Sequence, residues 1–185
     1  MKWARRSVVL ALALTIAACG GGGDIGGTIV GLTADGLVLS NGSETLAVAK
    51  DATTFAFANT LADGTVYSVT VVTQPTGLHC TVTGGTGIVK SADVAPDVQV
   101  DCVAVFTVGG TVSGLRGAGL VLGNGHEEVA VASGAPIYSF PTPLAAGASY
   151  DVVVVTQPAS QTCSVANGTG IVGDSAVTDV ALECR

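Results

Sequence analysis

Residues 67–75 read YSVTVVTQP, and residues 150–158 read YDVVVVTQP. In the first stretch apolar residues alternate with Ser68 and Thr70, which is the period-two pattern of a strand with one buried face. The two stretches are alike enough to indicate a duplication. A half-buried strand of this kind is therefore expected twice in the chain.

The duplication covers almost the whole chain after residue 24. The offset between the copies is 83 through most of their length and 82 at the end, where Cys102 matches Cys184. About half of the aligned positions carry the same residue. The shared residues are mainly Gly, Val, Leu, Thr, aromatic residues, Cys and a Gln-Pro pair, which are residues that build a fold. We therefore expect two units of one architecture, residues 25–103 and 106–185.

Each unit is predicted to be all-β. β-Branched and aromatic residues dominate, turn residues interrupt them at short intervals, and no helical period is present. The pair Asn41-Gly42 lies between two apolar runs and predicts a hairpin with a type I′ turn, and the same pair recurs in the second unit. That turn would place Leu37 opposite Leu46. With about seven short strands in roughly 80 residues, each unit should be a small antiparallel β-sandwich.

A pattern of aromatic, aliphatic and turn residues recurs in both units. In the first unit it consists of Phe55, Phe57, Leu61, Gly64, Tyr67, Val69, Val71, Gln74 and Pro75. In the second unit it consists of Phe140, Leu144, Gly147, Tyr150, Val152, Val154, Gln157 and Pro158. This pattern resembles the immunoglobulin-like and carboxypeptidase-regulatory-like β-sandwich repeats that occur in tandem in bacterial surface lipoproteins. The resemblance implies two immunoglobulin-like sandwiches, and its motifs are structural rather than catalytic.

Four of the five cysteines lie within the units. Four cysteines allow three pairings, and the duplication selects the one in which each unit closes on itself, Cys80 with Cys102 and Cys163 with Cys184. A zinc site is the competing interpretation, but the chain has no Cys-x-x-Cys pair and no His pair near these cysteines. Disulfides persist in exported proteins, and a loop of about 22 residues should add on the order of 3 kcal/mol to each unit.

The first 18 residues have the form of an export signal. Lys2, Arg5 and Arg6 precede an apolar run from residue 7 to residue 18. A helix of this length would span about 18 Å, which is short of the roughly 30 Å hydrocarbon core of a bilayer. The run is therefore typical of a signal peptide and not of a membrane span.

The apolar run ends in IAAC, residues 16–19, and four glycines follow it. This sequence resembles the lipobox of bacterial lipoproteins. The resemblance implies cleavage before Cys19, a lipid on its sulfur, and an acyl chain such as palmitate on the new amino group. Gly20, in place of Asp, implies sorting to the outer membrane. Residues 19–24 would then be the lipidated Cys and a short Gly tether, and several acyl chains give stable anchoring to the membrane.

The histidines do not form a catalytic or metal-binding motif. His79 and His126 lie in different units, and neither recurs in the other copy. His126 begins the run HEE, but Ala130 stands where a zinc-protease helix needs its second histidine. A solvated turn histidine is therefore the favoured interpretation of His126.

Two acidic positions recur in both copies. Glu44 matches Glu127 beside the Asn-Gly pairs, and Asp97 matches Asp179. These side chains could cap a turn or bind a cation. No calcium loop of alternating Asp and Asn surrounds them, which favours solvated acids.

The overall expectation is a lipid-anchored, non-enzymatic protein of the bacterial cell envelope with display, structural or protein-interaction roles. The net charge of −7, with seven basic residues, argues against a nucleic-acid partner. We expect no cofactor, and we expect an envelope or surface protein as partner. Residues 140–143, FPTP, differ from residues 57–60, FANT, and form the loop where a partner contact is expected. The alternative is a ligand- or glycan-binding module of the same fold, although the single tryptophan, Trp3, belongs to the signal.

Overall fold

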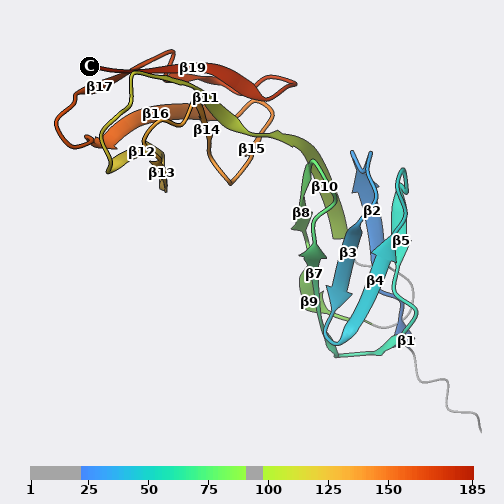
Figure 1. Ribbon diagram of the computed structural model, residues 1–185. Coiled ribbons are helices and arrows are strands. Elements are labelled where there is room, and N and C mark those ends of the chain that lie inside the picture. Colours follow the sequence, from blue (N-terminus) through green and yellow to red (C-terminus); the bar gives the residue numbers. More distant parts are fainter. Residues whose placement is uncertain (1–21, 91–97) are drawn as a thin grey trace, which may run out of the picture.

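The computed structural model describes residues 22–90 and 98–185, and every regular element in these residues is a β-strand (Figure 1). The strands form two consecutive sandwiches, each built from two four-stranded sheets. The predicted all-β class and the tandem sandwiches are confirmed. The β-branched and aromatic residues that dominate the sequence suit such pleated, half-buried surfaces.

In the first sandwich, a sheet of order β4-β3-β7-β9 packs on a sheet of order β8-β10-β2-β5. β2 and β10 run parallel, and the other pairs in these sheets are antiparallel. The strands are β2 (Gly26–Val30), β3 (Leu37–Asn41), β4 (Glu44–Val48), β5 (Thr54–Ala56), β7 (Val66–Thr73), β8 (Leu78–Thr83), β9 (Thr86–Ile88) and β10 (Val98–Phe106).

The second sandwich repeats this topology strand for strand. Its sheets have the orders β13-β12-β16-β18 and β14-β11-β19-β17, again with one parallel pair, β11 and β19. The strands are β11 (Val108–Ser113), β12 (Leu120–Asn124), β13 (Glu127–Val131), β14 (Ile137–Ser139), β16 (Ser149–Thr156), β17 (Cys163–Ala166), β18 (Thr169–Ile171) and β19 (Val177–Cys184). Three short strands complete the list: β1 (Gly22–Gly23) and β6 (Leu61–Ala62) form a separate pair, and β15 (Leu144–Ala145) pairs with the last residues of β10.

Alternation along the strands divides the side chains between core and solvent as predicted. Tyr67 and Val69 of β7 are buried, whereas Ser68 and Thr70 between them are exposed. Each sandwich has its own apolar core between its sheets. Fully buried side chains include Leu37, Leu39, Val98 and Val100 in the first core and Leu120, Leu122, Phe140 and Val180 in the second.

The hairpin of β3 and β4 is present, but its predicted register is wrong. Asn41 pairs with Glu44, so the turn lies one residue later than expected. Leu37 consequently lies opposite Val48, and not opposite Leu46. The core-facing side of the hairpin is the same in either register, because the partner changes by two residues.

The turn itself also differs from the prediction. Its two loop residues are Gly42 and Ser43, and only Gly42 has a positive φ, of 60°. A positive φ at the first loop residue alone is the pattern of a type II′ turn and not of type I′. Asn41 is held in the strand because its side-chain oxygen accepts a hydrogen bond from the backbone N–H of Ser68 on β7, at 3.0 Å. A tertiary contact therefore moves the turn.

The segment that leads into each sandwich adds a short strand to it. The last residues of β10, Val105 and Phe106, pair with β15 of the second sandwich. The backbone N–H of Ala146 also donates to the carbonyl of Ala104, at 2.9 Å. Phe106 packs against the second core. At the start of the first sandwich, β1 pairs with β6 in the same way.

Candidate functional site

Each sandwich contains one disulfide between directly opposed strand residues. Cys80 of β8 faces Cys102 of β10, and Cys163 of β17 faces Cys184 of β19. All four cysteines are buried, and the Cα atoms of each pair are 4.0 Å apart. The predicted pairing is confirmed. Each bond joins an edge strand to the strand beside it.

The repeated Gln-Pro pair has a role that the sequence analysis missed. The side-chain oxygen of Gln74 accepts from the backbone N–H of Cys80 at 2.7 Å, and its amide nitrogen donates to the Cys80 carbonyl at 2.9 Å. Gln157 binds both backbone groups of Cys163 with distances of 2.7 and 3.0 Å. Each glutamine thus replaces a neighbouring strand at the free edge of its sheet, beside the disulfide. The recurrence of a glutamine next to a proline in both copies was the sequence signal for this role.

The repeated glutamates cap loops. Glu44 accepts a hydrogen bond from the backbone N–H of Ala58 at 2.8 Å, in the loop after β5. In the second sandwich Pro141 occupies the position of Ala58 and has no N–H. Glu127 accepts instead from the N–H and the hydroxyl of Thr142, at 3.2 and 2.8 Å. The FPTP loop, where a partner contact was predicted, is therefore fixed to β13 through Thr142.

The remaining candidate polar residues are dispersed. His79 on β8 and His126 in the turn between β12 and β13 are exposed and belong to different sandwiches. Asp179 is exposed on β19, and its counterpart Asp97 lies outside the described residues. Within residues 22–90 and 98–185, no three His, Cys, Asp or Glu side chains come together as a metal site would require. No catalytic arrangement is apparent in this part of the chain.

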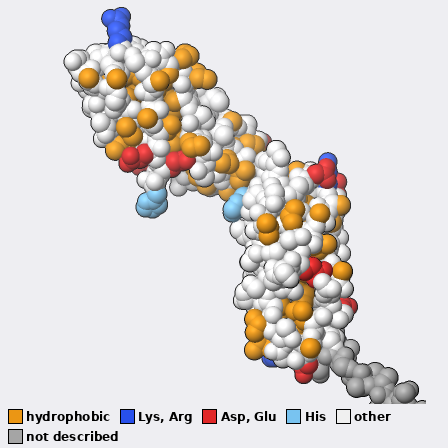
Figure 2. Space-filling view, turned by 60° about the horizontal axis from the view of Figure 1, so that its bottom comes forward, with side chains coloured by type: hydrophobic (Ala, Val, Ile, Leu, Met, Phe, Trp, Pro, Cys, Tyr) orange, Lys and Arg blue, Asp and Glu red, His pale blue; other side chains and the backbone are white. Residues whose placement is uncertain are grey.

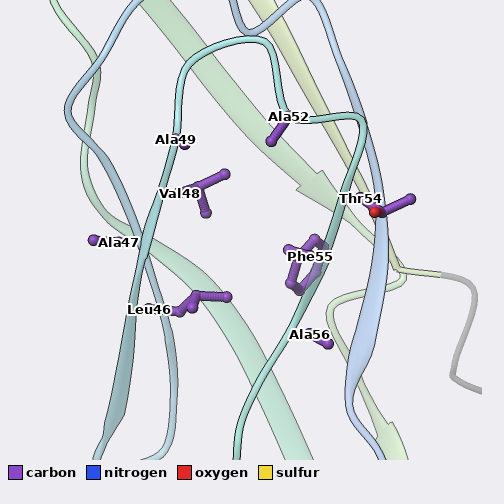
Figure 3. A pocket seen from close by; sticks show the side chains of 8 residues that line it. All are labelled: Leu46, Ala47, Val48, Ala49, Ala52, Thr54, Phe55 and Ala56. Carbon is purple, nitrogen blue, oxygen red and sulfur yellow. The ribbon is translucent and has the colours of Figure 1, made fainter.

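A small apolar hollow opens between the edge strands β4 and β5 of the first sandwich (Figure 3). Its volume is about 150 Å³. Leu46 and Val48 extend from β4 toward Phe55 of β5, so the hollow is an opening onto the core. No charged side chain contributes to its lining, which consists of Leu46, Ala47, Val48, Ala49, Ala52, Thr54, Phe55 and Ala56.

A larger hollow of about 490 Å³ lies along β14, β11 and β19 of the second sandwich. Glycines contribute part of its surface, and Ile137 is 68% exposed there. Uncharged residues line it throughout: Thr107, Gly109, Gly110, Thr111, Ile137, Tyr138, Ser139, Val177 and Thr178. A surface of this kind offers van der Waals contact and hydroxyl groups but no acid, base or nucleophile at neutral pH.

Tyr138 is the second copy's counterpart of Phe55, and its phenol is buried. Its hydroxyl has no hydrogen-bond partner in the described part of the chain. Burial, with a smaller contribution from Tyr150, raises the pKa of Tyr138 to about 12. The phenol therefore stays protonated at neutral pH and is not a reactive group.

Large hydrophobic side chains lie exposed on both sandwiches (Figure 2). Val66 and Ile88 are direct partners across β7 and β9, and they are 68% and 58% exposed. In the second sandwich Ser149 takes the place of Val66, while Ile171 takes the place of Ile88 and is 72% exposed. The other exposed large hydrophobics are Val30, Val72, Val103, Ile137, Val153 and Val155.

The predictions for the N-terminus fall on residues that the structure does not describe. The signal peptide, residues 1–18, and the lipidation site, Cys19, lie outside the described residues and stay predictions. No helix that could cross a bilayer is found in the stretches 22–90 and 98–185.

Comparison with known proteins assigns the chain to no family. No protein-family model matches the chain, and no curated protein matches it. The solved structure of the major pilin protein (T-13) from Streptococcus pyogenes serotype GAS131465 aligns over 89% of this chain and 95% of that chain, with 11% identity and a TM-score of 0.23. At this TM-score the alignment supports no argument about fold or function. Any functional proposal therefore depends on the residues of this chain alone.

Proposed function

We propose that the chain is a lipid-anchored, non-enzymatic protein of the bacterial cell envelope, held at the outer membrane by acyl chains on Cys19. Its two sandwiches display surfaces, space them from the membrane, or contact other envelope proteins through loops and strand edges. Free strand edges and fixed loops are common protein-binding surfaces.

One observation carries this proposal: three polar side chains that recur in both copies bind the backbone of their own sandwich in each copy. They cap a strand, a loop and a sheet edge, and none of them lines either of the two hollows described above. What was duplicated is therefore a scaffold and not a reaction centre. These side chains are Asn41 and Asn124, Glu44 and Glu127, and Gln74 and Gln157.

The charge of the chain bears on how the proposed anchor would hold it. The whole chain has a net charge of −7, and removal of residues 1–18 would also remove Lys2, Arg5 and Arg6. An acidic mature protein is repelled by anionic lipid, so electrostatic attraction would not hold it on a membrane. Acyl chains on Cys19 would supply the attachment.

The test replaces the lipidated residue and leaves the sandwiches intact. Wild type and Cys19→Ser, each with a C-terminal epitope, are fractionated and then labelled with antibody on intact and permeabilised cells. Wild type is expected in the outer-membrane fraction, and Cys19→Ser is expected to leave it. A Cys19→Ser chain that stays in the membrane would contradict the anchor. Labelling of intact cells would mean outward display, and labelling only after permeabilisation would mean a periplasmic scaffold.

A ligand-binding module is the second candidate, because the hollow along β14, β11 and β19 has the volume of a small-molecule site. Ligand binding to the native state raises the melting temperature. The experiment is a thermal-shift screen with sugars and small apolar compounds, repeated on Ile137→Thr, which restores the residue of the first copy. A shift in wild type that is lost in Ile137→Thr would favour this function, and no shift with any compound would count against it.

A further inference from the structure

The first described residues of the chain are held against the first sandwich. In the antiparallel pairing of β1 with β6, Gly22 lies opposite Ala62 and Gly23 lies opposite Leu61. A β-carbon on Gly23 would stand 2.8 Å from a methyl group of Val89, so the backbone packs closely there. The chain therefore joins this sandwich at a defined place, next to β6 and the residue that follows β9.

This attachment lies very near the proposed lipid. Cys19 precedes Gly22 by three residues, and consecutive Cα atoms are about 3.8 Å apart, so their Cα atoms can be separated by at most about 11 Å. In the anchored protein the acyl chains on Cys19 lie in the bilayer. The end of the sandwich that carries β1 and β6 is consequently kept within reach of the lipid headgroups.

An exposed apolar pair lies at that same end. The N–H of Gly64 donates to the carbonyl of Val89, and the N–H of Val89 donates to the carbonyl of Thr65, each at 2.8 Å. These bonds place Val66 and Ile88, which are next in sequence to Thr65 and Val89, beside the attachment of β1. Figure 1 shows β1 and β9 at the lower end of the first sandwich, and hydrophobic side chains reach this end in Figure 2.

The charged groups at this end set the depth of any contact. Asp24, Asp63 and Lys90 are all exposed. Carboxylates do not enter the hydrocarbon region, whereas Lys90 can extend its ammonium group to lipid phosphates while its methylenes stay near Ile88. The end is therefore suited to the headgroup region and not to insertion across the bilayer.

The second copy shows that these features are particular to the first. Its entering segment places Val105 and Phe106 where the first copy has Gly22 and Gly23. Ser149 replaces Val66 there. The first copy thus has an entering strand of two glycines and an exposed valine that the second copy lacks. Both features lie at the end nearest the proposed anchor.

We infer that the end of the first sandwich formed by Val66, Ile88 and Lys90 rests on the lipid surface, with the apolar pair at the level of the headgroups. This inference rests on the proposed anchoring through Cys19. It gives the first sandwich a fixed orientation on the bilayer, with the last strand, β10, leading from it to the second sandwich. The contact needs little affinity of its own, because the acyl chains already supply a high local concentration.

The chain allows a clean fluorescence test, because its single tryptophan, Trp3, would be removed with the signal. Val66→Trp reports on the proposed contact, and Ser149→Trp is the matched control at the same position of the second copy. Each lipidated mature variant is reconstituted in phosphatidylethanolamine and phosphatidylglycerol vesicles with or without brominated acyl chains, which quench nearby tryptophan. We expect Val66→Trp to lose roughly half of its emission, as a side chain a few ångströms into the interface would, and Ser149→Trp to lose none.

Vesicle flotation on the same samples separates the inference from the proposed function. Protein that does not float has no working anchor, which overturns both. Protein that floats while Val66→Trp is unquenched keeps its anchor but overturns the lipid contact. Equal quenching of both variants would place both sandwiches on the bilayer and overturn the proposed orientation. Ile88→Trp with Ile171→Trp as control repeats the test at a second pair of positions, in case one substitution impairs folding.

Discussion

The two sandwiches have the same strand order, the same disulfide and the same backbone-binding side chains, and three of their sequence differences bear on the account. The entering strand is Gly-Gly in one and Val-Phe in the other, the loop after β5 or β14 exchanges FANT for FPTP, and Phe55 becomes Tyr138. The shared parts hold the fold together, and these three differences lie at one end, in one loop and in one core. The comparison teaches which positions the scaffold requires and which it leaves free.

The largest effect is expected from the disulfides, and it should be equal in the two copies. Cys80→Ala with Cys102→Ala, and Cys163→Ala with Cys184→Ala, remove loops with sequence separations of 22 and 21. Loop-closure entropy predicts a loss of about 3 kcal/mol in the free energy of unfolding for either pair. Urea denaturation of the mature protein measures both. A loss confined to one copy would show that its disulfide does more than restrict the unfolded chain.

The glutamines at the sheet edges should come next. Gln74→Ala removes two hydrogen bonds to the backbone of buried Cys80, and Gln157→Ala does the same at Cys163. Leaving these backbone groups without partners should cost about 2 kcal/mol in each copy. Gln74→Glu is the matched control, because it keeps the acceptor and loses the donor, and a smaller loss is expected. If all three variants unfold like wild type, water replaces the glutamine, and the glutamine adds no stability at the sheet edge.

The smallest effect concerns the buried phenol, and its sign is opposite to that of the others. Tyr138→Phe removes a buried hydroxyl that has no partner in the described residues and should stabilise the second sandwich by up to about 1 kcal/mol. Phe55→Tyr, the reverse change in the first copy, should destabilise. Thermal unfolding of both variants checks the prediction. A Tyr138→Phe variant less stable than wild type would mean that the hydroxyl has a partner.

The same tyrosine predicts a dependence on alkaline pH. Burial raises its pKa to about 12 in the folded protein, whereas an unfolded tyrosine ionises near pH 10. The folded state therefore binds the phenol proton more tightly than the unfolded state does. The stability linked to this protonation is fully present below pH 10 and is lost as the pH rises toward 12. Wild type should lose stability faster than Tyr138→Phe above pH 10. Parallel curves for the two proteins would contradict the raised pKa.

Much of the scaffold could be predicted from sequence, because alternation and duplication are strong signals. The alternation around Ser68 and Thr70 predicted the faces of β7, and the duplication identified the pairing of Cys80 with Cys102. The predicted turn after β3 was wrong. The turn preference of an Asn-Gly pair is a local property, whereas Asn41 is held in the strand by a hydrogen bond from the backbone of Ser68 on β7. The role of Gln74 depends on the same kind of long-range contact.

The functional part was less predictable for a physical reason. Glu44 caps a loop because the fold brings the loop after β5 next to β4. The sequence does not show that these two segments lie close together. The exposed position of Val66 beside β1 likewise follows from the pairing of segments far apart in the chain. Conversely, the predicted export signal and the predicted lipidation of Cys19 rest on the sequence alone, since these residues lie outside the described ones.

The most direct test of an anchored, disulfide-linked scaffold is the mass of the intact mature protein, purified from membranes without reductant. The account predicts a chain that begins at Cys19, carries a lipid on the Cys19 sulfur and an acyl chain on its amino group, and lacks the hydrogens lost by forming two disulfides. A chain cleaved at another residue and free of lipid would contradict the anchor. Free thiols at Cys80, Cys102, Cys163 and Cys184 would contradict the scaffold.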